Sequence, residues 1–213
     1  MTFKATRERF FQALEKLEPD TVKVVKAAYD LAEKEHEGQS RKEHKTRPGD
    51  LDPYLIHPLR VSLIVMSELS LADVTAVTSA VLHDVVEDGN SRPTIDDIRL
   101  QFGDAIAEAV DYLTKPEAVE GEKHTPESLL PYHQSFFTAP LHVRLVKLSD
   151  RLDNLRESLL VERPQFQKRY LWETREVYLP LAKHTSTFFA ENYEELCFRL
   201  ESLINQQAAS SQS

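Results

Sequence analysis

The chain has 213 residues and a formal net charge of -9. An acidic chain lacks the basic surface that binding to phosphate backbones requires, so generic nucleic-acid binding is excluded. Its one cysteine, Cys197, excludes an intramolecular disulfide, and no stretch approaches the roughly 18 apolar residues of a membrane span or forms the apolar core of a signal peptide. We therefore expect a cytoplasmic protein without a membrane partner.

The pattern of apolar residues predicts an all-α fold: a single compact domain of about ten helices with no significant sheet. Five glycines in the whole chain and the lack of strand-like alternation favour the same interpretation. The expected helices cover residues 5–17, 20–37, 58–68, 71–88, 95–102, 104–115, 126–137, 140–158, 164–183 with a break near Pro180, and 186–206.

Several helix ends carry local signals. Ser70 and Thr94 each precede an aspartate by three residues, a pattern that predicts helix starts. Gly89 and Gly103 follow apolar-periodic segments, and glycine favours helix ends because it adopts left-handed conformations without strain. These signals bound the helices independently of the periodicity.

The most informative segment is VLHDVVEDG, which contains His83, Asp84, Glu87 and Asp88. If the segment is helical, the spacings of three and four residues place these side chains on one broad face. Crowded carboxylates repel one another, and a divalent cation removes that cost. Imidazole nitrogen beside carboxylate oxygen suits Mn²⁺, Zn²⁺, Fe²⁺ or Mg²⁺. A solvated acidic face is the simpler alternative.

Two other segments offer possible partners. The helix predicted at 140–158 has a leucine stripe, with Lys147, Asp150, Arg151 and Asn154 on its other side. Taken alone, this pattern favours an amphipathic surface helix. His57 precedes Pro58 among apolar neighbours. By itself it is more simply a hydrogen-bonded structural histidine than a metal ligand.

The irregular segment 38–53 contains the most basic patch of the chain, with Arg41, Lys42, Lys45 and Arg47 within seven positions. Such a patch could bind phosphate, and the planar guanidinium of Arg41 could stack on a base. A solvated charged loop explains the same residues equally well.

Four motifs in order, EHEGQSR, PYLIHP, HDVVED and KLSDRLDNLR, resemble the hydrolase domain of the RelA/SpoT alarmone proteins, a branch of the HD phosphohydrolases. Thr114 and Lys115 also resemble a stretch that precedes the last motif in that family. The resemblance covers a motif core at 27–156. With C-terminal helices at 164–206, it implies a single HD domain over 1–205. The composition of residues 206–213, rich in Ala, Ser and Gln, predicts a frayed tail.

The resemblance implies a role for each matching residue. The implied ligands of one Mn²⁺ ion are His57, His83, Asp84 and Asp150, and the implied catalytic pair that activates water is Glu87 and Asp88. The implied substrate contacts are Arg41, Lys42, Lys115, Arg151 and Asn154. Two imidazoles and two carboxylates would leave coordination positions for water and a phosphate oxygen.

The implied reaction removes pyrophosphate from the 3′ position of guanosine tetra- or pentaphosphate, giving GDP or GTP. The implied partner is thus a small guanine nucleotide, bound by a monomer or a homodimer. Only 57 residues follow Arg156, so we expect a stand-alone hydrolase without a synthetase domain. The alternatives are an HD phosphohydrolase of another nucleotide, such as a nicotinamide dinucleotide phosphate, and a non-catalytic nucleotide sensor.

The chain departs from the family pattern at three places. The segment between Arg41 and His57 is longer than usual. Glu157 replaces a small hydroxyl residue, and its negative charge could disfavour a nearby phosphate and alter the choice of substrate. Asp153 lies at a variable position, for which the resemblance implies no role.

Overall fold

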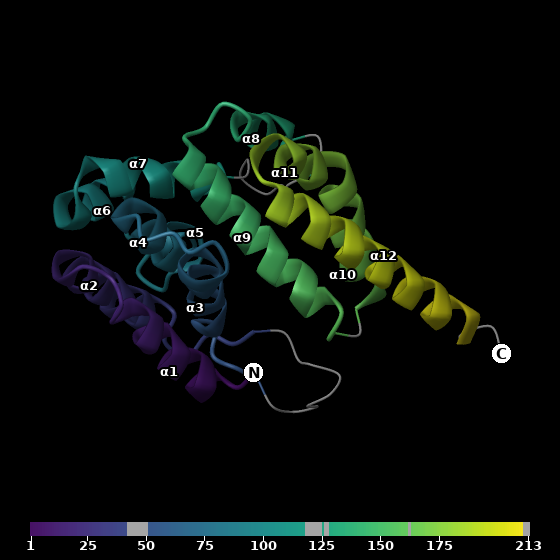
Figure 1. Cartoon of the computed structure of the whole chain (residues 1–213), viewed down its shortest axis with the longest axis horizontal. Helices are drawn as coiled ribbons and strands as arrows, with labels where there is room; N and C mark the ends of the chain where they lie inside the picture. The colour runs from purple at the N-terminus through teal and green to yellow at the C-terminus, as the bar shows by residue number, and fades with distance from the viewer. Residues whose placement is uncertain (42–50, 118–124, 126–127, 162, 211–213) are drawn as a thin grey trace.

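The computed structural model describes residues 1–41, 51–117, 125, 128–161 and 163–210 (Figure 1). These residues form α-helices and two short π-helical turns, and the prediction of an all-α fold is confirmed. The elements are α1 (Phe3–Leu14), α2 (Pro19–Glu35), α3 (Ile56–Leu63), η1 (Ile64–Glu68), α4 (Val74–Leu82), α5 (Val85–Asp88), α6 (Ile95–Phe102), α7 (Asp104–Leu113), α8 (Leu130–Ser135), α9 (Leu141–Ser158), α10 (Pro164–Glu173), η2 (Thr174–Tyr178), α11 (Leu179–Thr185) and α12 (Thr187–Ser210).

Helix α9 lies at the centre of the molecule. It packs against α3, α4 and α7 on one side and against α10, α11 and α12 on the other (Figure 1). Its apolar residues Val146, Leu148 and Leu152 are fully buried. Lys147 and Asp150 on its polar side are also nearly buried, so the surface helix favoured by the local pattern is wrong. A buried polar face has to find partners within the protein.

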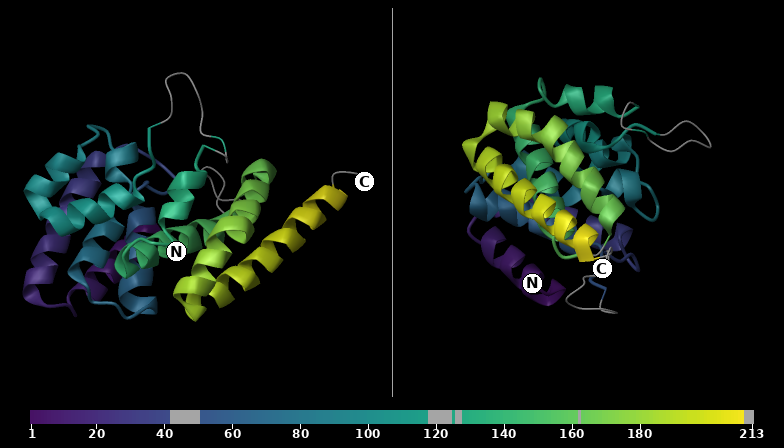
Figure 2. Two further views of the ribbon diagram at one scale, coloured as in Figure 1. Left: turned by 90° about the horizontal axis from the view of Figure 1, so that it is seen from above. Right: turned by 90° about the vertical axis from the view of Figure 1, so that its right-hand side faces the viewer.

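The C-terminal helices cover α9 with aromatic side chains. Phe189 and Tyr193 of α12 are fully buried, and the Tyr193 hydroxyl donates to the carbonyl of Leu148. The end of α12 extends beyond the other helices (Figure 2). Within the described residues, no helix is both long and apolar enough to cross a bilayer.

The helix predicted at 71–88 is not continuous. Helix α4 ends at Leu82 with His83 as its C-cap, and α5 begins after Asp84 as its N-cap. The start also differs, because the Asp73 side chain, rather than Ser70, caps α4 by accepting from the Ala76 amide at 2.7 Å. The His83–Asp84 pair therefore lies at a junction between two helices.

The two local signals predicted at the ends of helix α6 are confirmed. Thr94 begins α6 with a reciprocal capping box, and Gly103 ends it with φ of 87°, a conformation that glycine adopts without strain. The predicted break near Pro180 is not present, because the π-helical turn η2 joins α10 to α11 without a non-helical residue between them. Helix α3 begins at Ile56, two residues earlier than predicted, so His57 lies within its first turn.

Candidate metal and nucleotide site

The four predicted metal ligands meet at one place although they come from distant segments. His57 comes from α3, His83 and Asp84 from the α4–α5 junction, and Asp150 from the middle of α9. One donor atom from each of His57, His83 and Asp150 lies within 4.8 Å of the others. Asp84 Oδ2 lies 3.2 Å from His83 Nε2 and 3.8 Å from His57 Nε2.

The junction between α4 and α5 is what allows two adjacent residues to share this place. Consecutive side chains of a continuous helix point about 100° apart around its axis, since 3.6 residues complete a turn. Because α4 ends at Leu82 and α5 starts at Val85, His83 and Asp84 lie outside both helices, and Asp84 departs from regular helical backbone with φ of -104° and ψ of -6°. The two side chains therefore converge.

Both imidazoles present the same nitrogen to the cluster. His83 Nδ1 lies 2.9 Å from the carbonyl oxygen of Ala80, which can only accept, so Nδ1 is the donor. His57 Nδ1 lies 2.7 Å from Asp153 Oδ2. The two Nε2 atoms are 3.3 Å apart and face the carboxylates of Asp84 and Asp150.

The charges of the cluster are strongly coupled. Burial opposes ionisation of Asp150, but the Lys147 ammonium and the two histidines hold its pKa well below the usual range. The pKa of Asp84 is likewise low because of His83 and His57, despite burial. The carboxylates in turn raise the pKa of His83 to about 9, against the effect of burial. Two carboxylate and two imidazole donors suit a first-row divalent cation, so this donor set fits a metal.

Asp150 is held by further contacts from its own helix. Lys147 Nζ donates to Oδ2 at 3.0 Å, and Asn154 Nδ2 donates to Oδ1 at 2.6 Å. The sequence placed Lys147 on the polar face of this helix without assigning it a role. Its ammonium compensates the Asp150 carboxylate and leaves Oδ1 directed towards the histidines.

The two predicted catalytic acids lie beside the cluster in α5 and have different surroundings. Glu87 Oε1 accepts from Lys115 Nζ at 2.6 Å. Asp88 is exposed, and its Oδ2 is 3.3 Å from the Tyr54 hydroxyl, which also donates to Asp84 at 2.7 Å. Partial burial and the neighbouring charges of Asp84 and Glu87 raise the pKa of Asp88. Glu87 thus forms an ion pair with Lys115, whereas the net effect of its surroundings on Asp88 is a raised pKa.

Arg41 is buried beneath the site, with 7% of its surface exposed. Its Nη2 donates to Asn154 Oδ1 at 3.1 Å and to Glu157 Oε2 at 2.5 Å, and the guanidinium lies 5.2 Å from the Tyr54 ring centre. Two predicted substrate contacts, Arg41 and Asn154, are therefore neighbours. Lys42, also predicted to bind substrate, lies outside the described residues.

Arg151 faces the C-terminal helices. Its guanidinium lies between the rings of Tyr170 and Tyr178, at 4.6 and 4.1 Å from their centres, and Nη2 donates to Glu173 at 2.7 Å. Nη1 is buried without a hydrogen-bond partner among the described residues. A buried donor of this kind favours a missing acceptor, such as a phosphate oxygen.

Several residues of the site had no predicted role. Tyr54 bridges Asp84 and Asp88, and Asp153 contacts His57. The sequence signalled these two residues only by their position. Tyr54 is part of the motif PYLIHP, and Asp153 follows Asp150 by one helical turn. Glu157 differs from the expectation. It accepts from Arg41 and from Arg60, at 3.0 Å for the latter, so its negative charge is compensated within the protein.

Comparisons with known proteins identify the family. The HD domain family matches residues 28–188. The chain is 36% identical over 168 residues to a GTP pyrophosphokinase of Streptomyces coelicolor, covering 78% of this chain and 18% of that protein. It is 34% identical over 174 residues to a guanosine-3′,5′-bis(diphosphate) 3′-pyrophosphohydrolase of Aquifex aeolicus, covering 82% of this chain and 23% of that protein.

The chain thus spans about a fifth of the length of these curated relatives. A solved structure described as a metazoan ortholog of SpoT that hydrolyzes ppGpp shares the fold, with a TM-score of 0.70 at 23% identity, covering 84% of this chain and 96% of that one. The order of the four motifs and the meeting of their residues at one cluster agree with these matches. The chain therefore belongs to the HD domain family, and it is homologous to the RelA/SpoT alarmone proteins.

Proposed function

We propose that this protein hydrolyses guanosine 3′,5′-bis(diphosphate) and the corresponding pentaphosphate, releasing pyrophosphate from the 3′ position and leaving GDP or GTP. The observation that carries the proposal is the meeting of His57, His83, Asp84 and Asp150 next to an acidic pair. The activity for which the Aquifex aeolicus relative is named supports the choice of substrate.

The proposed metal is Mn²⁺, held by the two imidazole Nε2 atoms and the carboxylates of Asp84 and Asp150. When bound, such a cation polarises a phosphoryl oxygen and makes water more acidic. In the reaction, an oxygen of water bonds to the phosphorus attached at the 3′ position, and the bond from that phosphorus to the ribose oxygen breaks. One proton leaves the attacking water, and one arrives at the ribose oxygen.

Asp88 is the better of the two acids for accepting the proton of the attacking water. It is exposed, its raised pKa increases its affinity for a proton, and the Tyr54 hydroxyl orients its carboxylate. A general base of this type contributes about 10² to 10⁴ in rate. In this proposal Glu87 has a different task, since its ion pair with Lys115 holds that ammonium beside the cluster.

The cations around the cluster would bind the phosphates. Lys115 lies on the Glu87 side, and Arg151 lies on the α9 side with a buried N–H group that has no acceptor among the described residues. A bound diphosphate carries several negative charges, and charge-assisted hydrogen bonds from guanidinium and ammonium groups are the strongest available to it. Arg41 and Asn154, which contact each other, would bind the nucleoside end.

The proposal is tested with purified protein, Mn²⁺ and guanosine tetraphosphate. We expect GDP and pyrophosphate in equal amounts, no product with an Asp150→Ala variant, and no product after chelation of the metal. The same preparation analysed by light scattering distinguishes a monomer from a homodimer. Absence of both products with Mn²⁺, Mg²⁺, Zn²⁺ and Fe²⁺ would refute the activity.

A second candidate is hydrolysis of another nucleotide by the same site. The observation that favours it is the ion pair of Arg41 with Glu157, because a guanidinium paired with a carboxylate presents fewer free donors to a base. A screen of purine nucleotides and nicotinamide dinucleotide phosphates, with Mn²⁺ present, decides between the candidates. The higher kcat/KM identifies the substrate.

A further inference from the structure

One side chain of the candidate metal cluster, the His57 imidazole, is held from both of its nitrogens by α9. Asp150 Oδ1 lies 3.2 Å from Nε2, and Asp153 Oδ2 lies 2.7 Å from Nδ1. The two aspartates are three residues apart, so they occupy adjacent turns on the same side of the helix. The imidazole edge therefore lies against this side of α9, and the shorter contact is the one made by Asp153.

The contact with Asp153 decides which nitrogen of His57 carries the hydrogen. Asp153 is 3% exposed, and both of its carboxylate oxygens accept hydrogen bonds from Arg60. A hydrogen on either oxygen would oppose one of these donors, so the geometry is that of an ionised carboxylate. An ionised carboxylate can only accept hydrogen bonds, so Nδ1 must be the donor. The lone pair of a neutral imidazole is then on Nε2, which faces Asp84, Asp150 and His83.

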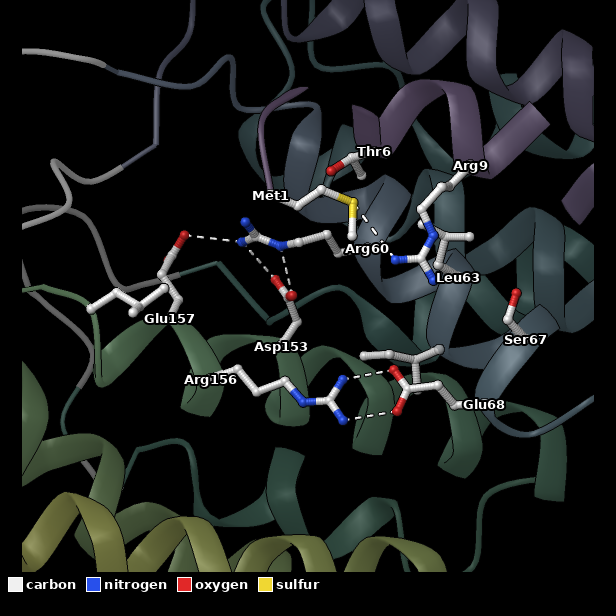
Figure 3. Close-up of a pocket in the computed structure, with 12 residues that line it drawn as sticks. Met1, Thr6, Arg9, Arg60, Leu63, Ser67, Glu68, Asp153, Arg156 and Glu157 are labelled. Carbon is white, nitrogen blue, oxygen red and sulfur yellow. Dashed lines mark hydrogen bonds and ion pairs between the residues drawn. The ribbon is translucent and has the colours of Figure 1, made fainter. Parts of the chain in front are cut away.

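Arg60 holds the Asp153 carboxylate in this orientation. Its Nε and Nη2 donate to the two oxygens of Asp153 at 2.7 and 2.9 Å, and Nη2 also donates to Glu157 at 3.0 Å (Figure 3). Bidentate pairing of a guanidinium with a carboxylate fixes the plane of both groups. Rotation of the Asp153 side chain would break three hydrogen bonds at once.

We propose that Asp153 is a positioning residue, which keeps the His57 imidazole in the Nδ1–H form and directs Nε2 at the metal. This inference rests on the proposed metal site and deepens it. Carboxylates that accept from the distal nitrogen of a metal-bound histidine restrict its rotation and strengthen it as a ligand, and losing one weakens metal affinity by about 10- to 100-fold.

A purely structural role for Asp153, as the partner of Arg60, is the alternative that the experiment must separate. The same region contains a second carboxylate–guanidinium ion pair, which serves as the control for the pair of Asp153 and Arg60. Glu68 and Arg156 make a bidentate ion pair at 2.7 and 2.8 Å on the other side of a cavity of about 260 Å³ that Asp153 and Arg60 also line (Figure 3). No imidazole contact of Glu68 is present among the described residues.

The first test is the affinity for Mn²⁺, measured by isothermal titration calorimetry on Asp153→Asn and Glu68→Gln. In Asp153→Asn, one amide oxygen replaces two carboxylate oxygens, and the new N–H₂ group faces donors of His57 or Arg60. We expect the affinity to fall about 10- to 100-fold in Asp153→Asn and to stay within about twofold of wild type in Glu68→Gln. An unchanged affinity in Asp153→Asn would overturn the proposal.

The second test uses the cavity. Asp153→Ala leaves a carboxylate-sized space that borders the cavity, so added formate can occupy it, whereas formamide supplies no charge. We expect formate, but not formamide, to restore Mn²⁺ affinity in Asp153→Ala and to have no such effect on wild type. If formate does not restore Mn²⁺ affinity in Asp153→Ala, and Asp153→Asn binds Mn²⁺ as tightly as wild type, the positioning role is contradicted.

The third test needs neither metal nor nucleotide. Nitrogen-15 NMR of the imidazoles, with His57 identified by the loss of its signals in His57→Gln, reports which nitrogen carries the hydrogen. We expect Nδ1–H in wild type and a shift towards Nε2–H in Asp153→Ala. If the wild-type protein bound no metal, the proposed function would fail, but this measurement would still test the role of Asp153. An Nδ1–H form of His57 that is unchanged in Asp153→Ala would refute that role.

Discussion

Glu157 provides the sharpest test of how this site is held together. It is 2% exposed and accepts hydrogen bonds from Arg41 and Arg60, of which Arg41 is itself only 7% exposed. We predict that Glu157→Gln, which keeps the shape of the side chain and removes its charge, substantially lowers the free energy of unfolding. The reason is that a buried guanidinium loses its anionic partner.

The magnitude follows from the contacts that remain. Removing one partner of a buried ion pair costs about 3 to 5 kcal/mol, because the other charge stays desolvated. Arg60 keeps its bidentate pair with Asp153, while Arg41 keeps its hydrogen bond to Asn154, so the lower end of that range applies. About 3 kcal/mol corresponds to a fall in Tm of roughly 6 to 12 °C for a chain of this length.

The assay is thermal and urea unfolding of the metal-free protein, followed by circular dichroism. The control is Glu68→Gln, which breaks an ion pair of similar geometry whose side chains are 35% and 37% exposed. An exposed pair contributes only about 0 to 1 kcal/mol, since water solvates both charges. A loss in Glu157→Gln no larger than that of the control would show that Arg41 does not depend on Glu157, and the reasoning would be wrong.

Four further predictions concern the cluster and its surroundings. Asp150→Ala should retain helical content but lose stoichiometric metal by elemental analysis, and retained metal would contradict its assignment as a ligand. Asp88→Asn should lower kcat by a factor of about 10² to 10⁴ with little change in KM. Glu87→Gln should lower kcat and also raise KM, because it releases Lys115. Unchanged activity in either variant would contradict the role assigned to that residue. Burial, with the nearby charges of Lys147 and Arg151, lowers the pKa of His133 to about 4. The pKa of a histidine in the unfolded chain is about 6.5. The stability that comes from keeping His133 neutral is therefore fully present above that pH and is lost as the pH falls towards 4. The loss is up to about 3 kcal/mol, and less where water screens the charges. His133→Gln should flatten this part of the stability profile in urea titrations, and an identical profile would refute the assignment.

The fold class could be predicted because it depends on local signals, and the meeting of the candidate metal ligands could be predicted from the resemblance to a known family. Helical periodicity, the Thr94 capping box and the stop at Gly103 involve residues that are close in sequence, and the structure has all three. The four motifs resemble those of a family whose members share one cluster, so His57 and Asp150 could be paired across 93 positions. Their distance of 3.2 Å agrees with that pairing.

What the local pattern missed are features that depend on packing. A continuous helix through His83 and Asp84 was the simplest prediction from the spacing, yet the helix is interrupted at these two residues. From the sequence alone, Asp153 had no predicted role, and the charge of Glu157 was expected to disfavour a nearby phosphate. Each acquires its role from Arg60, which lies on α3, more than 90 residues away.

The sequence by itself determined the residue types, their spacing and the helices that carry them, since these follow from backbone hydrogen bonding and side-chain periodicity. The tertiary structure decided which side chains are buried together, and hence which charges compensate one another. Burial makes that difference because the same carboxylate that repels a phosphate at the surface becomes the partner of a guanidinium in the interior, where water no longer competes for either charge.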